Sequence, residues 1–388
     1  MTPIPATAPG ASRVEMIVAT TRSDDAPPGE LFSGERGVGL RFADIAVSIP
    51  PDAVRRPGDV QWPASRTPDP SREFATLRAD RIDQAEALRR FHARLRQTGH
   101  RSVLLFVHGY NTRFEEAVYR LAQIAHDTRV PALPLLFTWP SRGRLLAYAY
   151  DRESANYSRD ALEAVLQALQ KDAAVREVYV LAHSMGNWVT LEALRQMAIR
   201  NGRIAPKIKS VMLAAPDVDV DVFRRQIATI GDDRAPFLLF VSQDDRALAV
   251  SSRVWGGDQR LGAVDPRREP VRSLLERSNV QVVDLTSEAS PDSANHARFA
   301  SSPLVAQLVG RRLAAGQTLT DGQAGFGESL GLVATGAAGA VGRAASIAIS
   351  APVAIVDPRT RQGLGDQIQD LGGQIGGAVQ GAGAVLPR

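Results

Sequence analysis

The sequence predicts an α/β fold in which helices flank a mostly parallel central sheet. Between residues 86 and 315, short apolar runs alternate with segments of helical periodicity, which is typical of parallel strands joined by crossover helices. The apolar runs are nearly continuous, as expected of strands that are covered on both faces. Hydrophobic residues make up 44% of the 388 residues, enough for a sizeable core.

The chain divides into three regions of different composition. Residues 1–85 are rich in Pro, Gly and Asp and contain two short strand patterns, so we expect a strand-and-loop extension that joins the core. Residues 86–315 carry the α/β pattern and form the predicted catalytic domain. Residues 316–388 are rich in Gly and Ala, which predicts a flexible or helical tail.

The expected elements follow in order along the chain. In the extension, strands are predicted at 14–20 and 44–49. In the α/β domain, strands are predicted at 103–107, 133–138, 177–182, 210–214, 236–241 and 280–285. Helical periodicity predicts helices at 115–126, 159–170, 188–199 and 271–277, and a last helix at 304–313 would close the domain.

Composition excludes several classes of function. The chain has no cysteine, so disulfides, a cysteine nucleophile and thiolate metal sites are excluded. Its 46 basic and 42 acidic residues are interspersed without a long basic run, so we expect no nucleic-acid partner. Walker, zinc-protease and dinucleotide-binding motifs are absent, so we expect neither a cofactor nor a metal. The first residues lack the pattern of a signal peptide, which favours a cytoplasmic location.

The strongest local signal follows the strand predicted at 177–182 and reads Leu181-Ala182-His183-Ser184-Met185-Gly186. A helix pattern begins directly after it, so the serine lies in a sharp turn between strand and helix. This is the position of the nucleophile in serine hydrolases of the α/β-hydrolase fold, whose usual motif is G-x-S-x-G. Ala182 stands where glycine is usual. We therefore predict that Ser184 is a nucleophile, with the helix N-terminus favouring negative charge.

An earlier loop, His108-Gly109-Tyr110-Asn111, follows the strand predicted at 103–107. In these hydrolases one oxyanion donor is the amide after the nucleophile, here Met185, and the other comes from such a loop. Glycine lets the backbone turn close to a substrate, so the Tyr110 amide is the predicted second donor. We expect His108 to order this loop. An ordinary glycine turn is the alternative.

The base and the acid are expected downstream of the nucleophile, in the order Ser, acid, His. Of the six histidines, His296 alone follows Ser184, so it is the predicted base. His183 is adjacent, but neighbouring side chains diverge in a tight turn, and we expect it to pack.

The acid is expected at the end of a strand. Asp245, after the strand predicted at 236–241, is preferred, and its neighbour Asp244 is a weaker alternative. Asp217, after the strand at 210–214, is the main rival. The other interpretation of Asp217 is a helix N-cap before Val220.

These motifs occur in series, and together they resemble the bacterial α/β-hydrolases grouped as DUF900 and described as esterase/lipase superfamily enzymes. The resemblance covers about residues 14–310 and implies an esterase- or lipase-like enzyme whose physiological substrate is generally not established. The matching strings are Val18-Ala19-Thr20-Thr21-Arg22, Val47-Ser48-Ile49-Pro50-Pro51, Phe106-Val107-His108-Gly109-Tyr110-Asn111, Thr138-Trp139-Pro140-Ser141, Ala182-His183-Ser184-Met185-Gly186-Asn187, Ala215-Pro216-Asp217 and Asp245-Arg246-Ala247-Leu248.

Ligands in open α/β sheets bind beyond the carboxyl ends of the strands. Trp139 and Tyr148, which follow the strand at 133–138, are therefore candidates to line a substrate pocket together with His108 and Gly109. Ordinary packing of this loop is the alternative. The predicted activity is cleavage of a small-molecule or lipid-like ester through an acyl-enzyme. The same residues would also serve an acyltransferase or a thioesterase.

The Gly-rich tail at 316–388 offers a function of a different class. Its spacing Gly373-x-x-x-Gly377-x-x-x-Gly381 lets helices approach closely, and residues 330–356 form a weakly apolar run. A flexible extension is the first expectation. The alternative is peripheral membrane contact or self-association, which would make the protein a membrane-associated binding or scaffold module.

Overall fold

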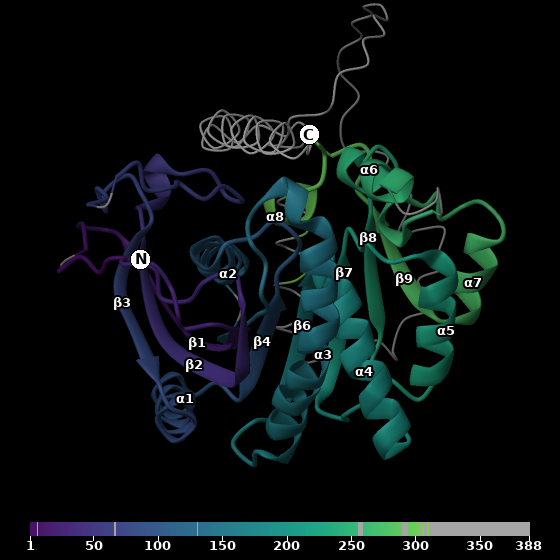
Figure 1. The fold of residues 1–388 in the computed structure, drawn as a ribbon, viewed down its shortest axis with the longest axis horizontal. Coiled ribbons are helices and arrows are strands. Elements are labelled where there is room, and N and C mark those ends of the chain that lie inside the picture. The colour runs from purple at the N-terminus through teal and green to yellow at the C-terminus, as the bar shows by residue number, and fades with distance from the viewer. Residues whose placement is uncertain are drawn as a thin grey trace, which may run out of the picture. The chain divides into compact units, whose positions relative to one another are not determined.

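One nine-stranded sheet organises the described part of the chain (Figure 1). The computed structural model describes residues 1–309 except 6, 66, 130, 255–258, 289–293, 303–304 and 306–308. The predicted tail at 316–388 and most of the helix predicted at 304–313 lie outside these residues.

The strands are β1 (Ser12–Arg22), β2 (Arg36–Ile49), β3 (Ala75–Ile82), β4 (Ser102–Val107), β5 (Leu133–Thr138), β6 (Glu177–His183), β7 (Ile208–Ala214), β8 (Phe237–Val241) and β9 (Val280–Asp284). The helices are α1 (Gln84–Thr98), α2 (Phe114–Thr128), α3 (Tyr148–Lys171), α4 (Gly186–Asn201), α5 (Val220–Ile230), α6 (Arg246–Val254), α7 (Val271–Arg277) and α8 (Arg298–Ser301). Short 3-10 turns occur at Asp52–Val54, Leu145–Ala147 and Leu261–Ala263.

The strand order is β3-β2-β1-β5-β4-β6-β7-β8-β9. β1, β2 and β3 pair antiparallel, and every pair from β1–β5 to β8–β9 is parallel. The predicted fold class is therefore confirmed, and the strands of the N-terminal extension join the same sheet. The region limits predicted at residues 85 and 315 stay predictions.

Buried apolar side chains form two clusters, one on each face of the sheet. Along β4, Leu105 belongs to one cluster, while Leu104 and Phe106 belong to the other, because successive side chains of a strand point to opposite faces. Residues of α1, α3, α4, α5 and α7 join the first cluster, and residues of α2 and α8 join the second. Helices thus cover both faces of the parallel strands, which explains their continuous apolar sequences.

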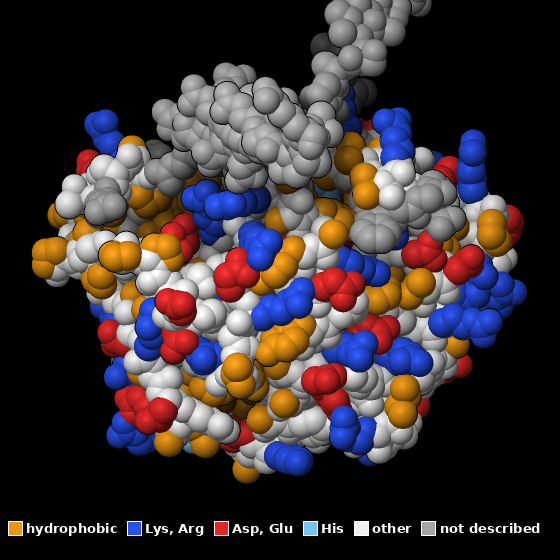
Figure 2. Space-filling model, viewed as in Figure 1, with side chains coloured by type: hydrophobic (Ala, Val, Ile, Leu, Met, Phe, Trp, Pro, Cys, Tyr) orange, Lys and Arg blue, Asp and Glu red, His pale blue; other side chains and the backbone are white. Residues whose placement is uncertain are grey.

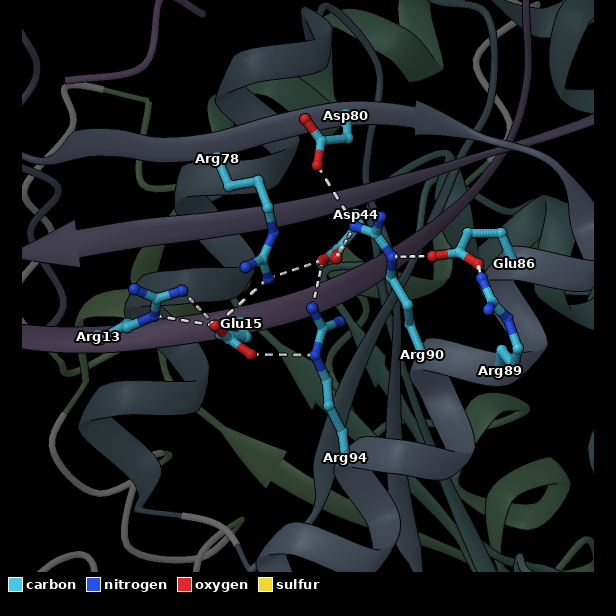
Figure 3. Close-up of polar contacts among 9 residues, drawn as sticks. All are labelled: Arg13, Glu15, Asp44, Arg78, Asp80, Glu86, Arg89, Arg90 and Arg94. Carbon is cyan, nitrogen blue, oxygen red and sulfur yellow. Dashed lines mark hydrogen bonds and ion pairs between the residues drawn. The ribbon is translucent and has the colours of Figure 1, made fainter. Parts of the chain in front are cut away.

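Ion pairs connect α1 to the N-terminal strands (Figure 3). We call this group the Asp44 cluster, and it consists of Glu15, Asp44, Arg78, Arg90 and Arg94. The Asp44 carboxylate on β2 accepts from Arg78 at 3.0 Å, from Arg90 at 2.6 Å and from Arg94. Arg94 also pairs with Glu15 at 3.0 Å. Burial raises the pKa of Asp44, but the hydrogen bonds from Arg94 and Arg90 outweigh burial and lower it. Asp44 therefore stays charged beneath α1.

β3 and α1 are absent from the elements expected from the sequence. β3 is an edge strand that carries charged residues, as edge strands often do, and α1 docks partly through arginines rather than through an apolar stripe alone. The mixed charges of the surface are visible in Figure 2, where Lys or Arg and Asp or Glu side chains intersperse over the drawn face. Within the described residues, no helix is both long enough and apolar enough to cross a bilayer.

Candidate active site

Ser184 lies in the turn between β6 and α4, and its backbone adopts a φ of 52°. A positive φ is uncommon for a residue other than glycine and marks a turn that its surroundings enforce. The Ser184 amide donates to the Ala214 carbonyl of β7 at 2.9 Å. Its carbonyl accepts from the Asn187 amide at 3.1 Å and from Asn187 Nδ2 at 2.9 Å. These bonds hold the strained turn from both sides.

Two glycines allow the loop after β4 to approach this turn. A Cβ atom on Gly186 would lie 2.3 Å from the His108 carbonyl oxygen, and one on Gly109 would lie 2.8 Å from Ser184 Cβ and 3.0 Å from His183 Nδ1. Any larger residue would push the two segments apart. Ala182, which departs from the usual motif, is fully buried in β6, where its methyl group is accommodated.

His296 and Asp245 lie together. His296 Nδ1 is 2.7 Å from Asp245 Oδ2, and Asp245 Oδ1 accepts from the Leu248 amide at 3.0 Å. The carboxylate is buried at the end of β8, whereas the imidazole is partly exposed. A carboxylate on Nδ1 fixes the tautomer and the orientation of the ring.

Asp244 holds the segment that carries His296. Asp244 Oδ2 accepts from Asn295 Nδ2 and from Arg298 Nη2, both at 2.9 Å. Asn295 and Arg298 flank His296 in the chain, so Asp244 fixes the loop while Asp245 fixes the ring. Asp244, the weaker alternative acid, therefore binds residues on either side of the histidine.

Asp217, the rival acid, lies beside the Ser184 turn but has other partners. Its amide donates to the Ser184 carbonyl at 3.2 Å. Its carboxylate accepts from the Tyr148 hydroxyl and from the Ser251 hydroxyl, both at 2.6 Å, and Arg260 Nε lies 3.5 Å away. The N-cap of α5 is Asp219 rather than Asp217, so the capping interpretation of Asp217 is wrong.

His108 supports the loop after β4 from beneath. The Trp139 amide donates to His108 Nε2 at 3.1 Å, so Nε2 is an acceptor and Nδ1 carries the proton that bonds the Gly109 carbonyl at 2.8 Å. Burial, together with the charge of Arg22, lowers the pKa of His108 to about 3. The ring therefore stays neutral and keeps this pattern of bonds.

Trp139 stacks on His108, with ring centroids 4.9 Å apart, and its indole donates to the His108 carbonyl at 2.9 Å. It is fully buried. This placement corrects the expectation that Trp139 and His108 line a substrate pocket, because both side chains pack inside the protein behind the loop.

Arg22, at the end of β1, is a site residue that the sequence analysis missed. Only 1% of it is exposed. Its guanidinium donates to the Thr112 carbonyl at 2.7 Å, to the Ser141 carbonyl at 2.9 Å and to Thr138 Oγ1 at 2.8 Å. Burial lowers its pKa to about 10, so it stays charged at neutral pH. The polar run that ends the strand predicted at 14–20 was the available signal.

Asp151, on the first turn of α3, was also missed. It is fully buried and accepts from the Ser141 hydroxyl at 2.6 Å, the Arg142 amide at 3.0 Å and the Asn111 amide at 3.2 Å. Burial raises its pKa. Arg22 and Asp151 together brace the loop that carries Tyr110. Asp151 can take this position because α3 begins at Tyr148, eleven residues before the start of the helix predicted at 159–170.

The two predicted oxyanion donors are backbone amides: that of Met185, directly after Ser184, and that of Tyr110, in the loop after β4. Neither the Tyr110 amide nor the Met185 amide donates to another described residue. The Tyr110 ring lies 5.0 Å from the Tyr148 ring, and its hydroxyl donates to the Leu145 carbonyl. Tyr148 in turn reaches Asp217, so this loop and the first turn of α3 meet beside Ser184.

His183 packs beside the predicted base. Its ring stacks on Phe299 at 4.5 Å and lies 4.7 Å from the ring of His296. Burial lowers its pKa well below the ordinary value, and the nearby His296 adds to this effect, so His183 is neutral. Across the described ranges, no three His, Asp or Glu side chains are grouped so as to hold a metal ion.

The parallel sheet and the strained serine turn between β6 and α4 define an α/β hydrolase. The chain belongs to the family described as alpha/beta hydrolase of unknown function (DUF900), whose model matches residues 83–312. The uncharacterized protein alr1448 of a Nostoc species is 25% identical over 132 residues, which cover 28% of this chain and 34% of that protein. The matched segment thus spans about a third of this relative.

Solved structures with a similar fold include Est1E from Butyrivibrio proteoclasticus, which is 11% identical with a TM-score of 0.36 and covers 56% of this chain and 89% of that chain. The esterase Pf2001 of Pyrococcus furiosus is 13% identical with a TM-score of 0.35, over 56% of this chain and 84% of that chain. Identities and TM-scores this low assign no activity to the chain.

Proposed function

We propose that the protein cleaves small-molecule esters through an acyl-enzyme formed on Ser184. Membership of an α/β-hydrolase family supports a hydrolase, and the serine and ester chemistry are the proposal. The observation that carries it is the strained turn at Ser184. The amides of Met185 and Tyr110 donate no hydrogen bond to another described residue. The pair formed by His296 and Asp245 at the end of a nearby strand supports it.

In this mechanism Ser184 Oγ attacks the ester carbonyl while His296 Nε2 takes the hydroxyl proton. Asp245 holds Nδ1 and stabilises the positive imidazolium. The amides of Tyr110 and Met185 donate to the carbonyl oxygen as it becomes negative. His296 then gives its proton to the departing alcohol, and a water molecule repeats the sequence to release the acid and restore Ser184.

Hydrolysis of p-nitrophenyl esters of increasing acyl length tests the proposal. Ser184→Ala should lower kcat by roughly 10⁴-fold or more, because no nucleophile remains. Ser287→Ala, which changes an exposed serine just after β9, is the matched control and should retain activity. Ser184→Ala activity within tenfold of the wild type would exclude the acyl-enzyme.

The same experiment separates hydrolysis from acyl transfer. With water as the acceptor, product release should not depend on an added alcohol or thiol. Faster turnover with either acceptor, and formation of the corresponding ester or thioester, would identify an acyltransferase on the same serine.

A further inference from the structure

The first turns of α3 lie between the loop after β4 and the nucleophile turn. On one side, Asp151 accepts from the Asn111 amide at 3.2 Å. On the other, the Tyr148 hydroxyl donates to Asp217, whose amide bonds the Ser184 carbonyl. Arg152 follows Tyr148 by four residues, so both side chains lie on the same helix face. Arg152 therefore lies near Tyr148 and Asp217, and the Asp217 amide bonds the Ser184 carbonyl.

The Arg152 guanidinium stacks on an aromatic ring. Its Cζ lies 3.5 Å from the centroid of Trp188, which follows Ser184 by four residues in the first turn of α4. The indole of Trp188 is itself fixed, since Nε1 donates to Asn156 Oδ1 at 2.7 Å. Stacking occupies the face of the guanidinium, and its N–H donors, which lie in its plane, remain available to an anion.

Within the described part of the chain, Arg152 has more positive than negative charge around it. Arg152 forms no ion pair or hydrogen bond with another described residue. The nearby Asp217 carboxylate is already engaged by two hydroxyls and has Arg260 at 3.5 Å, and Glu153 is exposed. Burial lowers the pKa of Arg152, and Arg260 adds to this effect, whereas the charges of Tyr148, Asp217 and Glu153 oppose it. Among the buried groups that the structure describes here, the guanidinium groups of Arg152 and Arg260 thus share the carboxylate of Asp217.

We propose that Arg152 binds an anionic group of the substrate, so that the esters cleaved at Ser184 carry a carboxylate or a phosphate near the scissile bond. This inference rests on the proposed function. A partly buried cation that forms no ion pair with a described residue is costly, and a carboxylate or phosphate accepts two parallel N–H bonds from one guanidinium. The substrate would supply the missing charge, and Trp188 would keep the guanidinium in place to receive it.

Matched esters test this charge preference. For the acyl side, the pair is p-nitrophenyl pentanoate and the mono-p-nitrophenyl ester of glutaric acid, with spontaneous hydrolysis subtracted. For the alcohol side, the set is methyl 3-butyryloxybenzoate, 3-butyryloxybenzoate and 3-butyryloxyphenyl phosphate, which also separates carboxylate from phosphate. The variants are Arg152→Met, Arg152→Lys and the control Arg159→Met on the same helix, whose side chain is 41% exposed.

We expect wild-type kcat/KM for at least one anionic ester to exceed that of its neutral match by about tenfold. Arg152→Met should remove this advantage, mainly by raising KM, while kcat/KM for the neutral ester stays within about threefold. Arg152→Lys should keep part of the preference, because it keeps the charge but not the planar fork. Arg159→Met should behave as the wild type.

Equal kcat/KM values for anionic and neutral esters in the wild type would overturn the inference. An Arg152→Met variant whose kcat/KM falls by the same factor for both kinds of ester would overturn it as well. Those results leave the Ser184 chemistry intact. If no ester of either kind is hydrolysed in a Ser184-dependent way, the proposed function itself fails.

Discussion

At the scale of single residues, the two oxygens of the Asp245 carboxylate have different partners. Oδ1 accepts from the Leu248 amide at 3.0 Å, which fixes the carboxylate against the start of α6, and Oδ2 lies 2.7 Å from His296 Nδ1. The oxygens of the Asp217 carboxylate instead accept from two hydroxyl groups, those of Tyr148 and Ser251. We infer that Asp245 orients the proposed base and that Asp217 holds the first turn of α3 through the Tyr148 hydroxyl.

Asp245→Asn should therefore lower kcat for p-nitrophenyl butyrate by roughly 10³- to 10⁴-fold, because an amide at this position favours the wrong imidazole tautomer. Asp217→Asn should lower kcat by roughly tenfold or less and act more on KM. Steady-state kinetics of the two variants, with circular dichroism to verify folding, decide between the acids. A larger loss of kcat in Asp217→Asn than in Asp245→Asn would assign the acid to Asp217.

Arg22 gives a second prediction at this scale. Its guanidinium holds the Thr112 and Ser141 carbonyls at once, and so fixes the loop that presents the Tyr110 amide. Arg22→Met should lower kcat by roughly tenfold or more with little change in KM, because the oxyanion donor acts mainly in the transition state. Arg22→Lys should rescue little, since one ammonium cannot replace a planar fork.

The control for Arg22 is thermal unfolding of the same samples. A buried arginine also contributes to stability, so the kinetic constants are compared well below the unfolding transition of each variant. If Arg22→Met lowers the unfolding temperature while kcat of the folded protein equals that of the wild type, Arg22 is only structural.

At the scale of elements, the attachment of α1 depends on the Asp44 cluster. The Asp44 side chain is 2% exposed and meets three arginines. Since its folded-state pKa is lowered, the carboxylate stabilises the fold above the unfolded-state pKa of about 3.9, and this contribution is lost as the pH falls below that value.

Asp44→Asn should lower the free energy of unfolding at neutral pH by roughly 3 kcal/mol, because it removes a buried charge that pairs with three arginines and leaves the buried Arg94 with Glu15 as its remaining ion-pair partner. The difference from the wild type should shrink below about pH 4. Asp80→Asn is the matched control: its carboxylate also meets Arg90, at 3.3 Å, but is 49% exposed, so it should cost about 1 kcal/mol or less. Equal losses in the two variants, measured by denaturant unfolding, would contradict the role of Asp44.

The elements also show what the sequence could and could not predict. Strands such as β5, with its bounds at Leu133–Thr138, were predictable because burial on both faces leaves an unbroken apolar run. β3 was not, since an edge strand with charged residues lacks that pattern. The Ser184 turn was visible as a local motif. The roles of Arg22, Asp151 and Asp244 were not, because they depend on contacts between segments far apart in the chain.

At the scale of the whole molecule, the pairing of the strands brings the residues of the candidate site together. β1 pairs with β5 so that Thr20 lies opposite Thr138, which brings Arg22 to the loops after β4 and β5. The parallel order then places the ends of β6 and β8, with Ser184 and Asp245, on the same edge of the sheet. Reactivity at Ser184 should consequently require the native fold.

Labelling with a fluorophosphonate, followed by intact-mass and peptide analysis, tests whether the native fold makes Ser184 a reactive nucleophile. The native protein and Ser287→Ala should each gain one probe, on the peptide that contains Ser184, and neither Ser184→Ala nor the urea-unfolded protein should be labelled. Labelling of Ser184→Ala to the wild-type extent, or no labelling of the native protein, would contradict the assignment of Ser184 as the nucleophile.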